Sequence, residues 1–415
     1  MLFNRPRAER VMARLGIDAL VASSPENVMY GTDYECVTHW GNKGFQLYSV
    51  FSPGHAPVAS LIAPSLELDA IVDGDVWVED VYLFSPFPRG PAPVEAMDRV
   101  GREGRALEER SHKAASALDG LVAALEARGL ANGRIAVDET GMTPLAYEAL
   151  KARLPGATLV PGGPVWWEIR MVKTAEEIRR LTEATRITED AINQAFKLLA
   201  PGVTERSIIR EYHKHVVAQD GRPTFMILGS GPRTGYPHIL PSDKVIQAGE
   251  VVRHDIGCTY RYYHSDTARA VVLGTPTGEQ QRIWDALSQG VEDAIALIRP
   301  GADVKDLWRA AMRPGQQLGL ANFHRFHCGH GIGIVIYDPP VVTTADSSTS
   351  AFLMPAFEGG FEPDMVINVE VGYYIQGVQG FLCEDTMVVT ETGCERLTHN
   401  SKALAYDDYM ATVGA

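Results

Sequence analysis

The sequence predicts a two-domain chain, with an α/β N-terminal domain over residues 1–163 and an α+β domain over residues 164–415 that contains an internal duplication. At 415 residues the chain is too long for one hydrophobic core, because a domain usually holds about 100–200 residues. Helical and strand-like segments alternate before the chain breakers at residues 162–164. After them, a helix–helix–hairpin pattern occurs twice.

The N-terminal elements follow from local patterns of apolar residues and chain breakers. Proline lacks the backbone N–H that regular structure needs, so we expect no regular element in the proline-rich segment 86–93. The remaining segments are an amphipathic helix at 7–15, a buried strand at 18–23, a turn at 24–27, strands at 47–51 and 57–62 joined by a hairpin at 52–54, and a helix at 113–127.

The second domain opens with a helix and then repeats its plan. Thr174 and Glu177 have the spacing of a capping box, and an apolar stripe at helical spacing runs from there to Leu198. The helix ends before a Pro-Gly pair, and a shorter helix begins at Thr204. The segment 198–203 resembles 297–302 in sequence and in its place between a long and a short helix. We therefore expect two related halves with a cleft between them.

Each half ends in a hairpin that carries two acidic residues. If the first hairpin turns near residues 260 and 261, Asp255 and Asp266 face each other with Cβ atoms about 5 Å apart. In the second, Glu370 and Glu384 are symmetric about a glycine and are again expected to be cross-strand neighbours. Like charges this close repel each other, so half-buried strands could hold them only with a cation.

A metal centre explains these four carboxylates. Their combined charge of −4 is cancelled by two divalent cations, and His330, flanked by glycines that let the backbone pass close to a metal, supplies a nitrogen ligand. Such an oxygen-rich set favours manganese, iron or cobalt over a thiolate type of zinc site. Two cations there would activate water and polarise a carbonyl.

The order and spacing of Asp255, Asp266, His330, Glu370 and Glu384 resemble those of the pita-bread metallopeptidase family, which includes aminopeptidase P, prolidase, methionine aminopeptidase and creatinase. Further segments that look like blocks of this family lie at 170–173, 237–243 and 329–333, and residues 24–34 look like part of the creatinase-type N-terminal domain.

The resemblance implies a role for each of these residues. Asp255 would bind one metal, Asp266 and Glu384 would bridge both metals, and His330 and Glu370 would complete the second site. Glu370 would also be the base for the attacking water, and His238 would contact the substrate or the oxyanion. Two divalent ions are implied, manganese first, with iron, cobalt or zinc as alternatives, and a homodimer is expected.

The chain departs from the family pattern where the substrate would bind. Tyr337 stands where the family's peptidases usually have a second histidine, Asp338 follows it, and Leu382 stands where they often have an arginine. We therefore expect an intact metal core with an altered substrate-facing part, in which Tyr337 and Asp338 bind the substrate. His324 and His327 are interpreted as structural residues.

The favoured function is a metallohydrolase that cleaves an amide or related C–N bond in a short peptide or other small molecule, as an Xaa-Pro dipeptidase or aminopeptidase P does. The alternatives are a metal-dependent lyase of the dimethylsulfoniopropionate-lyase type, with Asp338 as base, and a non-peptide C–N hydrolase like creatinase or ectoine hydrolase. A metal-free binding protein would be expected to have lost ligands, and all five are present.

Composition narrows the partners and the compartment. The net charge of −14 leaves no general surface for neutralising phosphates, so we expect no nucleic-acid partner. Apolar stretches end well before the roughly 20 residues that cross a bilayer, and the N-terminus lacks the apolar core of an export signal. Five scattered cysteines without a C-x-x-C pair indicate reduced thiols. We expect a cytoplasmic enzyme with no membrane partner.

Overall fold

The structure is a computed structural model that describes residues 1–42, 44–90, 92–344, 357 and 359–413. The chain forms two compact units, Met1–Arg170 and Met171–Ala415. The expected domain boundary after residue 163 falls at the start of the last helix of the first unit. No helix in the described ranges combines the length and the apolar character that crossing a membrane requires.

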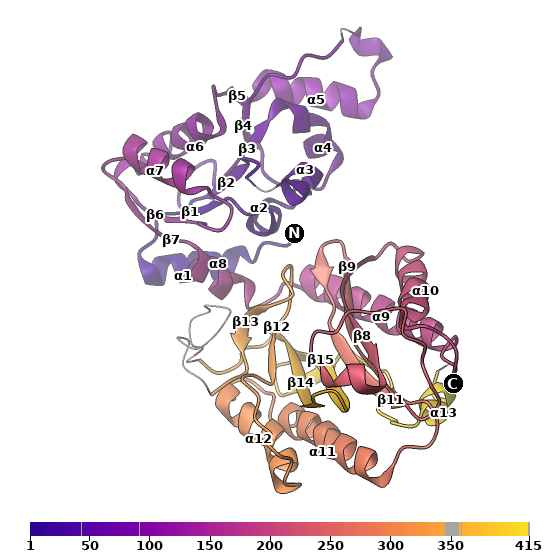
Figure 1. Cartoon of the computed structure of the whole chain (residues 1–415). Coiled ribbons are helices and arrows are strands. Elements are labelled where there is room, and N and C mark those ends of the chain that lie inside the picture. Colours follow the sequence, from indigo (N-terminus) through magenta and orange to yellow (C-terminus); the bar gives the residue numbers. More distant parts are fainter. Residues whose placement is uncertain (43, 91, 345–356, 358, 414–415) are drawn as a thin grey trace. The chain divides into compact units, whose positions relative to one another are not determined.

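The first unit is built on a seven-stranded mixed sheet with helices packed against it (Figure 1). The strand order is β5-β4-β3-β2-β1-β6-β7, and α6 contacts β2, β3 and β4. The strands are β1 Ala19–Ala22, β2 Tyr48–Phe51, β3 Ala59–Pro64, β4 Asp80–Phe84, β5 His112–Lys113, β6 Arg134–Val137 and β7 Thr158–Pro161. The helices are α1 Arg5–Leu15, α2 Pro25–Thr32, α3 Val37–Gly41, α4 Leu68–Asp73, α5 Arg99–Arg110, α6 Ala117–Glu126, α7 Pro144–Arg153 and α8 Gly163–Arg170, with short 3-10 turns at Ser65–Glu67, Val94–Ala96 and Leu130–Asn132.

Two N-terminal predictions are corrected by the structure. Residues 24–27, expected to be a turn, begin helix α2: the Ser24 side chain accepts a hydrogen bond from the Asn27 amide, and Pro25 occupies the first helical position. Serine and proline favour both turns and helix starts, which explains the error. The helix expected at 113–127 begins at Ala117, where Ser116 caps it, while residues 112–113 add an edge strand to the sheet.

The second unit contains the expected duplication, two copies of a helix pair followed by antiparallel strands (Figure 1). The first half comprises α9 Ala175–Phe196, α10 Glu205–Val217, β8 Arg222–Ser230, η4 Gly231–Gly235, β9 Val251–Tyr260, β10 Tyr263–His264 and β11 Thr267–Val272. The second half comprises α11 Gly278–Ile295, α12 Val304–Gln317, β12 Gly329–Gly331, β13 Asp338–Val341, β14 Val366–Ile375, β15 Gln379–Val389 and β16 Cys394–Arg396, and α13 Tyr406–Ala411 follows.

The helix starts in this unit are those that the sequence predicts. Thr174 and Glu177 form the capping box at the start of α9, and Thr204 caps α10. Each helix pair packs on its own sheet: α9 and α10 contact β9 and β8, and α11 contacts β14 and β15. The two sheets meet where β11 contacts β15, and this junction brings the acidic strands of both halves together.

The pairing of the first hairpin differs from the prediction. Ala268, and not Asp266, lies opposite Asp255. The chain reverses at Arg261 and Tyr262, whose φ angles are 46° and 69°, as in a two-residue turn that matches the twist of the strands. The shift is by two residues, so the alternation of side chains is preserved. Asp266 still faces the same cavity as Asp255, from a position two residues along the hairpin.

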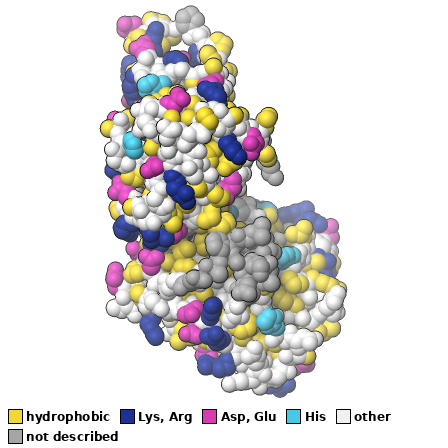
Figure 2. All heavy atoms as spheres, turned by 90° about the vertical axis from the view of Figure 1, so that its left-hand side faces the viewer, with side chains coloured by type: hydrophobic (Ala, Val, Ile, Leu, Met, Phe, Trp, Pro, Cys, Tyr) yellow, Lys and Arg dark blue, Asp and Glu magenta, His cyan; other side chains and the backbone are white. Residues whose placement is uncertain are grey.

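The pairing of the second hairpin is confirmed. Glu370 of β14 lies directly opposite Glu384 of β15, and Gly377 in the connecting loop has a φ of 71°. Two apolar cores flank the acidic strands. One packs α11 and α12 against β14 and β15, and the other packs α9 and α10 against β9. On the face shown in Figure 2, basic and acidic side chains are interspersed.

Candidate metal centre

A cavity of about 180 Å³ in the second unit collects most of the predicted site residues. Its carboxylates come from β9, from the segment between β10 and β11, and from β14 and β15, so strands of both halves contribute. The cavity is lined by Phe225, Pro237, His238, Asp255, Asp266, Arg325, His327, Tyr337, Glu370, Tyr374 and Glu384.

A cluster that could hold a metal ion consists of Asp266 and Glu384, which line the cavity, and of His330, and the ligand atoms of all three lie within 4.8 Å of one another. All three side chains are buried. His330 Nε2 lies 3.8 Å from Asp266 Oδ2, and its Nδ1 lies 2.9 Å from the carbonyl oxygen of Gly331. A proton on Nδ1, donated to that carbonyl, leaves the lone pair of Nε2 facing the carboxylates. Nitrogen and oxygen donors in this arrangement can hold a divalent cation.

Hydrogen bonding in the cluster supports its use as a ligand set. Asp266 Oδ1 is buried and has no hydrogen-bond partner among the described residues. Such an oxygen is costly to bury unless something else satisfies it. Glu384 accepts a hydrogen bond from Asn368 Nδ2 at 3.1 Å, and the Thr386 hydroxyl donates to Asn368 Oδ1 at 2.7 Å. These contacts orient one carboxylate and leave the other open, so the residues present fit a metal.

The electrostatics of the cavity favour a bound positive charge. Burial, followed by the charge of Glu370, raises the pKa of Asp255 to about 7. Burial and the neighbouring carboxylates hold the pKa of Asp266 and of Glu384 well above the ordinary range. Burial lowers the pKa of His330 to about 4, so its imidazole is neutral, the form that binds metals. A divalent cation relieves this repulsion between carboxylates.

Glu370 has two partners that the sequence reasoning did not assign. Arg325 Nη2 donates to Glu370 Oε2 at 2.6 Å, and His327 Nδ1 lies 3.2 Å from Glu370 Oε1. Burial is the largest single influence and raises the pKa of Glu370, but the charges of its basic neighbours, Arg325 first among them, together outweigh burial and hold this pKa below its usual range. Glu370 is therefore ionised, as a base or ligand must be.

The sequence predicts a purely structural role for His327, and this prediction misses its place in the site, because His327 lines the cavity. The interval of three residues between His324, His327 and His330 is the available signal in the sequence. Arg325 has no such signal, because it reaches Glu370 only through the path of the loop before β12.

Tyr337 and Asp338 occupy different environments although they are adjacent. Tyr337 lines the cavity, and its ring stacks on His330 with centroids 3.7 Å apart. Burial raises the pKa of Tyr337, so it keeps its hydroxyl proton at neutral pH. Asp338 is fully buried and forms an ion pair with Lys173 at 3.1 Å. Asp338 is not among the described residues that line the cavity, and this position does not favour contact with a substrate.

His238 is exposed and lines the cavity from the segment between η4 and β9. The buried carboxylate of Glu205 ties down the chain on both sides of His238, accepting hydrogen bonds from the Ser230 amide at 2.8 Å and the Ser242 amide at 2.9 Å. The position is therefore fixed by the fold, and the ring remains accessible.

Two further sequence observations concern packing. Leu382 is buried beside Gly372. A Cβ atom added at Gly372 would lie 2.8 Å from Leu382 Cδ1 and 2.9 Å from Arg325 Nη1. Leucine thus fills space beside the arginine that approaches from another loop. Cys258, Cys328 and Cys383 are fully buried in the two cores, where cysteine packs as a small apolar residue.

Comparison with known proteins agrees with this geometry. A family model described as metallopeptidase family M24 matches residues 179–391, and one described as the creatinase/prolidase N-terminal domain matches residues 5–172. The uncharacterized peptidase YqhT of Bacillus subtilis is 30% identical over 273 residues, which span 65% of this chain and 74% of the relative. The Xaa-Pro dipeptidase of Pyrococcus furiosus is 30% identical over 240 residues, which span 57% of this chain and 66% of the relative.

Similar solved structures confirm the predicted fold class. The dipeptidase PepE from Mycobacterium ulcerans has a TM-score of 0.75 at 24% identity and covers 97% of this chain and 98% of its own. The prolidase from Pyrococcus horikoshii has a TM-score of 0.74 at 22% identity and covers 96% of this chain and 99% of its own. At these identities the likeness concerns the fold alone, including the N-terminal unit.

Proposed function

Since this chain belongs to metallopeptidase family M24, we propose that it is a dinuclear-metal-dependent hydrolase of an amide bond in a short peptide, with Xaa-Pro dipeptides as its first candidate substrates. Relatives named Xaa-Pro dipeptidase and prolidase support this choice. The observation that carries the proposal is the acidic cavity, in which four carboxylates and His330 converge and one buried carboxylate oxygen has no partner among the described residues.

Each ligand has a proposed task. Asp266, His330 and Glu384 would hold one cation, and Asp255, with Asp266 and Glu384 as bridges, would hold the second. Glu370 would complete the first site. When bound, the cations would polarise the substrate carbonyl and lower the pKa of a water molecule.

The remaining residues bind the substrate or move protons. Glu370, kept ionised by Arg325, accepts the proton of the attacking water and passes it to the leaving amine. The exposed ring of His238 donates a hydrogen bond to the oxygen that gains negative charge. The Tyr337 hydroxyl, held in place by stacking on His330, is a neutral donor to the bound substrate.

The finer properties are also proposals. The donor set of four carboxylates and one imidazole favours manganese over softer metals, with iron, cobalt and zinc as the ions to compare. A homodimer is proposed, to be tested by light scattering. A cytoplasmic location is proposed because the five cysteines form no disulfide in the described parts of the chain.

The test is hydrolysis by the metal-reconstituted protein of Xaa-Pro dipeptides, with products identified by mass spectrometry. A sulfonium acid is incubated in parallel. Release of free proline that depends on added metal and is lost in Asp266→Asn is the expected result. Metal-dependent elimination from the sulfonium acid, with the dipeptides left intact, would replace the hydrolase by the lyase.

A further inference from the structure

Arg253 is a fully buried arginine on strand β9, two residues before Asp255. Side chains alternate along a strand, so Arg253 and Asp255 point to the same face of the sheet. Asp255 lines the acidic cavity, whereas Arg253 is not among the described residues that do so. Arg253 therefore lies behind the wall of the site, where it can act on the site only through other residues.

The charge of Arg253 is not balanced by an acidic partner. Among the described residues its guanidinium forms no ion pair, and its Nε and Nη1 atoms are buried without a hydrogen-bond partner. Arg269, a buried arginine on β11 of the same hairpin, by contrast forms an ion pair with Asp385 at 2.6 Å. A buried charge without an ion pair opposes folding, so stability alone does not account for Arg253.

The remaining nitrogen of the guanidinium holds the chain next to His238. Arg253 Nη2 donates to the carbonyl oxygens of Tyr236 and of Pro237, at 2.9 Å each. The Pro237 carbonyl belongs to the peptide bond that joins Pro237 to His238. Arg253 thus fixes the backbone directly before His238, at a point between the two segments that Glu205 holds.

The strand beside Arg253 leaves room for this contact. Gly229 of β8 lies opposite Arg253, so both positions face the same side of the sheet. A Cβ atom at Gly229 would lie 2.7 Å from Ile239 Cγ2 and 3.3 Å from the Arg233 carbonyl oxygen. A side chain at Gly229 would therefore push the segment 233–239 away from the sheet, and with it the carbonyl groups that Arg253 binds.

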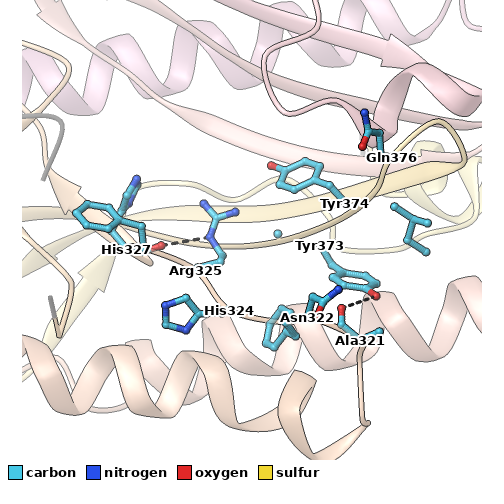
Figure 3. Close-up of a pocket in the computed structure, with 12 residues that line it drawn as sticks. Ala321, Asn322, His324, Arg325, His327, Tyr373, Tyr374 and Gln376 are labelled. Carbon is cyan, nitrogen blue, oxygen red and sulfur yellow. Dashed lines mark hydrogen bonds between the residues drawn. The ribbon is translucent and has the colours of Figure 1, made fainter. Parts of the chain in front are cut away.

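Arg253 also contacts the second half of the unit. Its guanidinium carbon lies 5.1 Å from the ring centroid of Tyr374 on β14, as in a cation–π contact. Tyr374 lines the acidic cavity and also a neighbouring cavity of about 550 Å³ between the loop 321–327 and the strand segment 372–376 (Figure 3). One buried side chain thus joins two parts of the cavity wall that come from different halves of the duplication.

We propose that Arg253 is a positioning residue that holds His238 at the acidic cavity. The proposal rests on the proposed function, in which His238 donates a hydrogen bond to the oxygen that gains negative charge. No described residue forms a hydrogen bond or an ion pair with the His238 ring, so the place of this ring depends on its backbone. A displacement of about 1 Å in a catalytic group can cost about 10²-fold in rate.

Kinetics of Ala-Pro hydrolysis by the manganese-loaded protein test the proposal. Arg253→Met should lower kcat by about 10–100-fold with unchanged metal content. Arg253→Lys should lower it by about fivefold or less, because one ammonium group can donate to both carbonyls. In the His238→Ala background, Arg253→Met should lower kcat by about twofold or less, since the group that it positions is already absent.

Arg128→Met is the matched control. Arg128 is a buried arginine of the first unit that also donates to two backbone carbonyls, those of Ala124 and Pro57, at 2.8 Å each. Its replacement should change kcat by about twofold or less. If Arg253→Met does not fold, Gly229→Val tests the same contact from the neighbouring strand, and it should lower kcat only when His238 is present.

Crystal structures of wild type and Arg253→Met, grown under the same conditions, give a readout that does not depend on activity. The His238 ring should be displaced by about 1 Å or more in the variant. If wild type cleaves no peptide, the proposed function fails, and a displaced His238 still supports the positioning role. Superposed His238 rings, equal losses of kcat in the wild-type and His238→Ala backgrounds, or loss of bound metal in Arg253→Met would overturn the proposal.

Discussion

Replacing Arg325 by methionine should destabilise the metal-free protein by about 2–3 kcal/mol. Removing one partner of a buried ion pair costs about 3–5 kcal/mol, because the other charge is left without compensation. The side chain of Arg325 is 16% exposed, that of Glu370 is 9% exposed, and His327 remains 3.2 Å from the carboxylate, so we expect a loss at or just below the lower end of this range. For a unit of this size the loss corresponds to a fall in melting temperature of roughly 4–12 °C.

The assay is thermal unfolding followed by circular dichroism, with a chelator present. Glu370→Gln and the double variant Arg325→Met/Glu370→Gln complete a double-mutant cycle. Because a neutral amide does not need the guanidinium, Arg325→Met should cost less than about 1 kcal/mol in the Glu370→Gln background. Arg313→Met is the control, since Arg313 forms an exposed ion pair with Asp293 and should change stability by less than about 1 kcal/mol.

Added manganese should narrow the gap between Arg325→Met and wild type, because the cation then compensates the carboxylate. Equal losses from Arg325→Met in the wild-type and Glu370→Gln backgrounds would refute the reasoning, since the effect of Arg325 would then come from packing and not from its charge.

Three further outcomes are expected. Asp266→Ala should abolish metal binding and turnover together, and full turnover with retained metal, measured by elemental analysis, would contradict the bridging role. His238→Ala should lower kcat by about 10²–10⁴-fold and leave metal content unchanged, and an unaltered rate would exclude a catalytic contact. Burial raises the pKa of Glu177 to about 7, above its unfolded value, so wild type loses stability as pH rises from about 4.5 to 7. Glu177→Gln should remove this loss and be more stable than wild type by at most about 3 kcal/mol at pH 8. In urea unfolding this gain in stability should fade below pH 5. A gain that does not depend on pH would contradict the role assigned to the Glu177 carboxyl group.

Much of the fold is readable from local signals. The capping box at Thr174, the helix start at Thr204 and the Glu370–Glu384 pairing all depend on residues within one element or one hairpin. The first hairpin shows where such reading fails. Its register depends on two consecutive residues with positive φ, Arg261 and Tyr262. Turns of this type usually contain glycine, asparagine or aspartate, so arginine and tyrosine do not predict one.

The candidate site divides in the same way. The five predicted ligands follow from charge repulsion and spacing. Four of them line the cavity, and His330 clusters with two of these, Asp266 and Glu384. Arg325 could not be predicted, because its contact with Glu370 spans 45 positions of the chain and depends on loop geometry. The burial of Asp338 against Lys173 likewise depends on the tertiary structure. The adjacent Tyr337 lies in a different environment, stacked on His330.

The central claim is that two cations neutralise the carboxylates of the acidic cavity. Crystals of wild-type protein soaked with manganese and measured at the manganese absorption edge test it most directly. Two anomalous peaks are expected, both bridged by Asp266 and Glu384, with His330 on one of them. A cavity without peaks, with these side chains turned toward solvent at saturating manganese, iron or cobalt, would contradict the account.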